Sequence, residues 1–98
     1  MSDMTTFRRE IDSLDEELIK ALARRFDIVR EVAAYKSRTG VAVIQPDRIR
    51  QIKDRCTDLG GSYGMRPEFL RQLYDLIIAE SCFLEHELVQ RAKQGSRS

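Results

Sequence analysis

Several residue types that mark common protein classes are scarce in this 98-residue chain. Its two Cys and one His cannot form an ordinary zinc site, and two Cys do not make a disulfide framework. Five Gly and two Pro are too few for a turn-rich β fold. A formal net charge of +1 argues against nucleic acid or an anionic membrane as the main partner. The composition therefore gives no sign of an ordinary zinc site, and neither nucleic acid nor a membrane is the expected main partner.

The chain also lacks long apolar runs. None approaches the roughly 18 residues of a membrane span, and no apolar signal-peptide region follows Met1. We expect a soluble, reduced, cytoplasmic protein whose residues 1–98 form a single domain.

Apolar residues recur along residues 6–38 in alternating four- and three-residue steps, beginning with Phe7, Ile11, Leu14 and Leu18. This spacing predicts one long helix. About 33 residues make a rod of roughly 50 Å, against a diameter of roughly 26 Å for a compact chain of this size. The apolar stripe therefore cannot be buried within one chain, and we predict an intertwined helical homodimer.

Two further helices complete the predicted all-α fold. Gly40 ends the first helix, and Pro46 opens a second that runs to about residue 59. The segment 60–64, which holds three glycines, is predicted to be a loop. Pro67 opens a third helix to about residue 92, and residues 93–98 are predicted to be a disordered tail. The predicted core stripes are Ile49, Ile52, Cys56 and Leu59 on the second helix, and Leu70, Leu73, Ile77, Leu84 and Leu88, flanked by Tyr74 and Ile78, on the third.

Two cations interrupt the stripe of the first helix. Arg25 and Lys36 stand eleven residues apart, which leaves them only about 20° out of line at about 100° per residue. Because an unpaired buried charge costs several kcal/mol, an anionic group should meet them. Glu80 or Glu85 could pair with them, or Lys36 could extend to water from the helix end. The more specific alternative is that the two cations line a pocket for an anionic small molecule.

The third helix carries a similar interruption, because Ser81 and Glu85 stand four residues apart and share a face. Taken alone this pair could be a solvated edge, but together with Arg25 and Lys36 it favours the pocket. Arg8 lies roughly 26 Å along the rod from Arg25, so one chain cannot aim both at one ligand. In a two-fold dimer, Arg8 of one chain could reach the site of the other.

These residues, in this order, resemble the all-helical, type II class of chorismate mutases. The resemblance covers nearly the whole chain and is carried by residues 7–15, 22–25, 32–36, 47–48 and 73–81. It implies three helices per chain, intertwined as a dimer with two sites. It also implies an isomerase that rearranges chorismate to prephenate by a [3,3] Claisen reaction, with no nucleophile, metal or cofactor.

The resemblance also implies a role for each matching residue. Arg8 from the partner chain and Arg25 would clamp the two substrate carboxylates. Lys36 would contact a carboxylate and the ether oxygen, whose developing charge it suits. Arg48 and Ser81 would support the end of the site that holds the ring carboxylate.

Glu85 takes the place of the family's second ether-oxygen donor, which is usually Gln. A carboxylate there would repel the developing negative charge, so we expect Glu85 to act protonated and activity to be favoured at low pH.

One residue departs from the family pattern: Ile49 stands where a Glu often takes the C4 hydroxyl of the substrate. Either Gln45 or backbone groups would then have to recognise C4. Two related activities stay open, a 4-amino-4-deoxychorismate mutase of an antibiotic pathway and an isochorismate pyruvate lyase. The spacing from Lys36 to Arg48 resembles a mutase loop. A catalytically silent helical dimer, acting as a binding or regulatory module, is the alternative outside enzymes.

Overall fold

The structure is a computed structural model that describes residues 3–95, and within them it holds three helices and no strand. The helices are α1 (Met4–Thr39), α2 (Pro46–Ser62) and α3 (Pro67–Gly95). The described chain measures 64 × 28 × 15 Å with a radius of gyration of 17.6 Å, against about 13 Å for a compact chain of this length. The all-helical fold and its very long first helix are confirmed.

Both ends of α1 are closed by local chemistry. At the start, the Asp3 carboxylate accepts a hydrogen bond of 2.9 Å from the backbone N–H of Thr6. This bond lowers the pKa of Asp3. At the end, Gly40 adopts the left-handed conformation (φ 74°) and its N–H donates to the carbonyl of Lys36 at 2.8 Å. Gly40 therefore stops the helix, as predicted.

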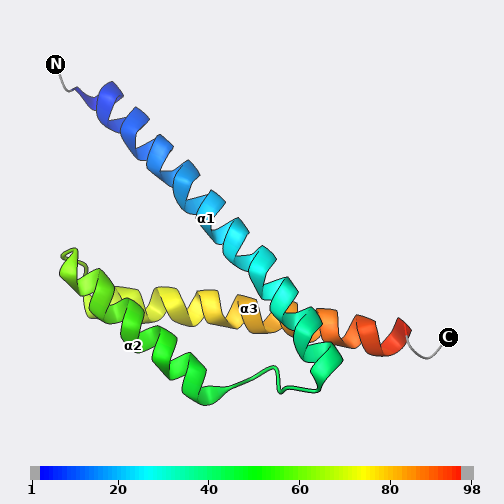
Figure 1. Ribbon diagram of the computed structural model, residues 1–98. Helices are drawn as coiled ribbons and strands as arrows, with labels where there is room; N and C mark the ends of the chain where they lie inside the picture. Colours follow the sequence, from blue (N-terminus) through cyan, green and yellow to red (C-terminus); the bar gives the residue numbers. More distant parts are fainter. Residues whose placement is uncertain (1–2, 96–98) are drawn as a thin grey trace.

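The helix α3 is the common support of the fold, because α1 and α2 each pack on it while their backbones do not approach each other within the described residues. Figure 1 shows α2 and α3 as an antiparallel pair, with α1 crossing the second half of α3. The N-terminal half of α1 stands clear of the other two helices. The backbones of α1 and α2 are therefore connected through their shared support on α3.

The glycine pair at residues 60–61 does not form the predicted loop, because α2 continues to Ser62. The reason is packing. Gly60 is buried, and a Cβ at this position would overlap the Cδ1 atom of Leu70, which is only 4% exposed. The missing side chain lets the end of α2 approach the start of α3 closely.

Two other predictions about the helices need correction. α3 extends to Gly95, since Lys93 and Gln94 are good helix formers, and the rest of the predicted tail (96–98) lies outside the described residues. The buried face of α3 matches the predicted stripe only in part. Leu70 and Ile78 are buried as predicted, but Ser81 and Glu85 complete the buried face. The rest of the predicted stripe is half-buried, which applies to Leu73, Ile77, Leu84 and Leu88. Leu59 of the α2 stripe is 55% exposed.

Most of the apolar stripe of α1 is exposed in the single chain. Ala33 is its one buried residue among those described, whereas Phe7, Ile11, Leu14 and Leu18 are all exposed, Leu14 by 61%. Exposing this much apolar surface on one helix is unfavourable in water. Among residues 3–95, no helix is both long and apolar enough to cross a membrane.

The two neighbouring glycines should respond oppositely to alanine. We expect Gly60→Ala to lower the free energy of unfolding by about 1–3 kcal/mol, because its Cβ overlaps the buried Leu70 side chain. Gly61→Ala should raise the free energy of unfolding by up to about 1 kcal/mol. A Cβ at residue 61 would have no atom of a neighbouring element within 4 Å, and alanine favours the helix. Urea unfolding at one fixed protein concentration measures both. Equal effects of the two substitutions would contradict this account of the α2–α3 contact.

Candidate functional site

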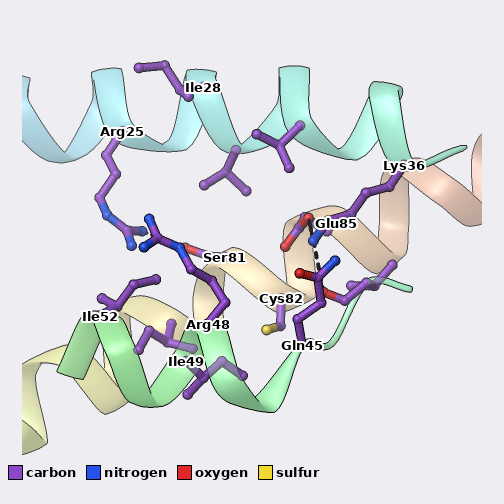
Figure 2. Close-up of a pocket in the computed structure, with 14 residues that line it drawn as sticks. Arg25, Ile28, Lys36, Gln45, Arg48, Ile49, Ile52, Ser81, Cys82 and Glu85 are labelled. Atoms are coloured by element: carbon purple, nitrogen blue, oxygen red, sulfur yellow. Dashed lines mark hydrogen bonds and ion pairs between the residues drawn. The ribbon is translucent and has the colours of Figure 1, made fainter. Parts of the chain in front are cut away.

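A cavity of about 300 Å³ lies between α1 and α2, with α3 as its floor and the 40–45 connector at one end (Figure 2). Seven of the eight predicted site residues line it. The lining consists of Arg25, Ile28, Val29, Val32, Lys36, Val43, Gln45, Arg48, Ile49, Ile52, Ile78, Ser81, Cys82 and Glu85. Arg8 is the exception, since it is exposed on the N-terminal half of α1. Residues from all three helices therefore meet in one hollow.

Arg25 and Ser81 form a fixed pair at one end of the cavity. The Nη1 of Arg25 donates to the Ser81 hydroxyl at 2.8 Å. That hydroxyl donates in turn to the carbonyl of Ile77, also at 2.8 Å. Ser81 is buried and its single proton is already used, so its main effect is to hold the Arg25 guanidinium. The remaining N–H groups of Arg25 stay available for an anionic ligand.

Lys36 and Glu85 form a buried ion pair at the other end. Lys36 Nζ lies 2.8 Å from Glu85 Oε1, and the two side chains are only 13% and 9% exposed. Lys36 also donates to the carbonyl of Val43 at 2.9 Å, which ties it to the connector. An acid from another helix thus meets Lys36, one of the alternatives that the sequence left open. Glu80, the other candidate, is exposed.

Glu85 keeps an unused hydrogen-bonding capacity inside the cavity. Oε1 is buried, and its one polar contact among the described residues is the Lys36 ammonium at 2.8 Å. A carboxylate oxygen can accept more than one hydrogen bond, so this atom can still accept another. A ligand with a donor group at this end would supply that hydrogen bond.

Arg48 brings a third cation to the cavity. Its guanidinium accompanies that of Arg25 near Ser81 in Figure 2. Arg48 Nη1 donates to Gln51 Oε1 at 2.7 Å, a contact within α2. Two guanidinium groups that face one end of a cavity repel each other unless an anion lies between them, and a carboxylate fits both forks.

Gln45 and Ile49 line the side of the cavity formed by the connector and the start of α2. Gln45 Nε2 donates to the carbonyl of Ala42 at 3.2 Å. Ile49 is apolar, so this part of the lining has no carboxylate. Gln45 is therefore the uncharged polar side chain on this side of the cavity, beside Ile49 and the cationic Arg48.

Sequence reasoning did not place Cys82 at the site, although it follows Ser81 directly. Cys82 lines the cavity, where burial raises the pKa of its thiol and the nearby Glu85 carboxylate raises it further. The thiol is thus not activated as a nucleophile. The pKa of Tyr74 is raised by a hydrogen bond with Cys56 and by burial, although the positive charge of Arg25 lowers it.

The lining dictates what the cavity can do chemically. Arg25, Arg48 and Lys36 supply three cations, Glu85 supplies one acid, and aliphatic side chains make up much of the remaining wall. Within residues 3–95 no three His, Cys, Asp or Glu side chains group as a metal site. This combination suits binding and electrostatic stabilisation of a small organic dianion.

Comparison with known proteins points in the same direction. The family model described as chorismate mutase type II matches residues 7–86. A 4-amino-4-deoxychorismate mutase of Streptomyces venezuelae is 38% identical over 90 residues, which span 92% of this chain and 87% of that protein. One from Streptomyces pristinaespiralis is 36% identical, over 88% of this chain and 67% of that protein. A bifunctional chorismate mutase/prephenate dehydratase of Escherichia coli is 30% identical over 90% of this chain, but only 23% of its own length is covered.

Proposed function

The chain belongs to the chorismate mutase type II family, and on that premise we propose that its cavity catalyses the [3,3] rearrangement of a chorismate-type dicarboxylate. Family membership confirms the resemblance and the isomerase class expected from the sequence. The observation that carries the proposal is the convergence of Arg25, Lys36 and Glu85 on one cavity of about 300 Å³. The reaction is unimolecular, so the site needs to hold and stabilise its substrate rather than attack it.

The arginine end of the cavity would hold the substrate in its reactive shape. The reaction requires the enolpyruvyl tail to fold over the ring, which is rare in solution. Arg25, fixed by Ser81, and Arg48 would bind a carboxylate through paired N–H donors. Holding both ends of a flexible substrate in a near-attack geometry lowers the barrier by removing the entropy of folding it.

The Lys36–Glu85 end would stabilise the breaking bond. Negative charge grows on the ether oxygen as the C–O bond lengthens, and a preorganised cation in a dry site stabilises that charge. Lys36 is already fixed by Val43 and Glu85. Glu85 would complete the site as a neutral donor to the same oxygen, after giving up its ion pair with Lys36.

We propose that the working unit is a homodimer. Three observations support this: the exposed apolar stripe of α1, the N-terminal half of α1 that stands clear of its own chain, and the position of Arg8 on that half. A second copy that covers the stripe would bury it and bring its own Arg8 to a cavity that lacks a fourth cation. Arg8 of the partner would then bind the second substrate carboxylate.

For the substrate, we favour 4-amino-4-deoxychorismate, with chorismate as the second candidate. The two relatives that match most of both chains are named for the amino compound. The bifunctional chorismate mutases are matched over a quarter or less of their length, but they share the mutase segment. Ile49 removes the carboxylate that would take a C4 hydroxyl, which fits a changed group at C4. The lyase and the silent dimer remain as outcomes of the test below.

A parallel assay on chorismate, 4-amino-4-deoxychorismate and isochorismate tests this function. We expect rearrangement of the amino compound with the highest kcat/KM. Lys36→Met should lower kcat/KM by about 10²–10³-fold, because it removes the preorganised cation at the ether oxygen. Lys20→Met is the matched control, since Lys20 pairs with Glu16 on the exposed surface of α1 and does not line the cavity. Pyruvate release from isochorismate would indicate the lyase, and no turnover would indicate the silent dimer.

The pH dependence of the mutase should reside in Glu85. If the active form is the protonated acid, kcat/KM of the wild type falls as the pH rises from 5 to 7.5. Glu85→Gln keeps a donor at every pH, so its profile should be flatter. The measurement is kcat/KM of both proteins across that range. The same decline in both proteins would rule out Glu85 as the titrating donor.

Shared sites between two chains can be tested by mixing inactive variants. Arg8→Ala and Arg25→Ala should each lose most activity as homodimers. After joint unfolding and refolding, half of the dimers are mixed, and each mixed dimer has one site with both arginines. About a quarter of the wild-type activity should therefore return. Sedimentation equilibrium confirms that each variant dimerises, and no recovery in the mixture would place Arg8 outside the partner's site.

A further inference from the structure

We propose that the Gln45 side chain is the group that recognises the C4 substituent of the substrate, and so decides between a hydroxyl and an amine at that carbon. This inference rests on the proposed function. It starts from the chemistry of the substrate. The C4 carbon is bonded to the carbon that carries the ether oxygen, so the two substituents are neighbours. Whatever binds at C4 must lie next to the groups that serve the ether oxygen.

The structure has a side chain in that place. Lys36 and Glu85 mark the ether end of the cavity, and Gln45 lies at the same end, on the connector side (Figure 2). The neighbouring residue of α2 that faces the cavity is the aliphatic Ile49. Gln45 does not belong to the Lys36–Glu85 pair. Its amide oxygen can therefore accept a hydrogen bond from the ligand at this end of the cavity.

The start of α2 gives an independent reason to assign Gln45 a role beyond the fold. Gln45 is the N-cap residue of α2, a position where Ser, Thr, Asp or Asn would satisfy free backbone N–H groups. Its side chain makes no capping bond. Gln45 is exposed, and its amide nitrogen instead donates to the carbonyl of Ala42 at 3.2 Å, which directs the amide along the connector. A residue that forgoes a local stabilisation and is held beside a cavity is expected at a functional position.

The held amide discriminates through its oxygen. With its nitrogen bound to Ala42, Gln45 presents Oε1 as an acceptor. A C4 hydroxyl donates one hydrogen bond to it, whereas a C4 amine, an ammonium near neutral pH, donates a charge-assisted bond that is about twice as strong. Lys36 nearby repels an ammonium, and Glu85, once protonated and donating to the ether oxygen, has no negative charge to offset that repulsion. Binding of a C4 amine therefore depends on the acceptor that Gln45 adds.

Two substitutions separate acceptor strength from shape. Gln45→Met keeps the length of the side chain but removes the acceptor. Gln45→Glu keeps the shape and adds a negative charge, and a carboxylate at the start of a helix favours folding. Gln94→Met serves as the matched control, since Gln94 is exposed near the end of α3 and does not line the cavity. The experiment measures kcat/KM of each protein on 4-amino-4-deoxychorismate and on chorismate.

The ratio of the two kcat/KM values is the decisive readout. We expect Gln45→Met to lower the ratio of amine to hydroxyl by about fivefold or more, and Gln45→Glu to raise it by a similar factor. Gln94→Met should leave it unchanged. If the wild type turns over either substrate and neither Gln45 variant moves the ratio, the Gln45 assignment is overturned while the mutase function stands. If the wild type turns over neither substrate, the function itself fails, and the assignment with it.

Discussion

The arrangement of the molecule depends on one constraint, that α1 and α2 both pack on α3 and not on each other. A helix pair in direct contact would fill the space between its axes with interlocking side chains. Here the third helix keeps the other two apart, and the space that remains has a rigid wall on three sides. The polar side chains lie in a cavity whose other lining residues are Ile, Val and Cys. Charges placed in such surroundings interact more strongly than they would on the surface.

Two charged clusters make the opposite ends of this cavity electrostatically different. Arg25 and Arg48 make one end strongly positive, whereas Lys36 and Glu85 balance each other at the other. A ligand with two carboxylates and an ether between them has a matching polarity. Because the described residues of the cavity supply fixed donors and none of them is an activated nucleophile, the chemistry we propose for it is the stabilisation of charge that the substrate itself redistributes.

Much of the fold could be predicted from the sequence because its signals are local. Gly40 stops α1, Pro46 and Pro67 start the next helices, and the eleven-residue spacing of Arg25 and Lys36 placed both on one face before any packing was known. The glycine pair at 60–61 was misassigned because its role depends on Leu70, which is ten residues further along the chain. Likewise the hydroxyl of Ser81 could be placed near a ligand, but its bond to Arg25 depends on how two helices cross. Glu80 and Glu85 were equivalent candidates until the rotation of α3 buried only one of them.

The bond between Lys36 and the carbonyl of Val43 has a consequence for how this protein can change over evolutionary time. Surface connections between helices ordinarily accept insertions and deletions, because nothing inside the molecule depends on their path. The segment from Gly40 to Gln45 is different, since its backbone holds a lysine inside the cavity while its last residue is the N-cap of α2. Its length is therefore set by the site rather than by the fold. In related chains that share these three helices, a change in the length of this segment should alter the reaction at the site more than it alters the stability of the fold.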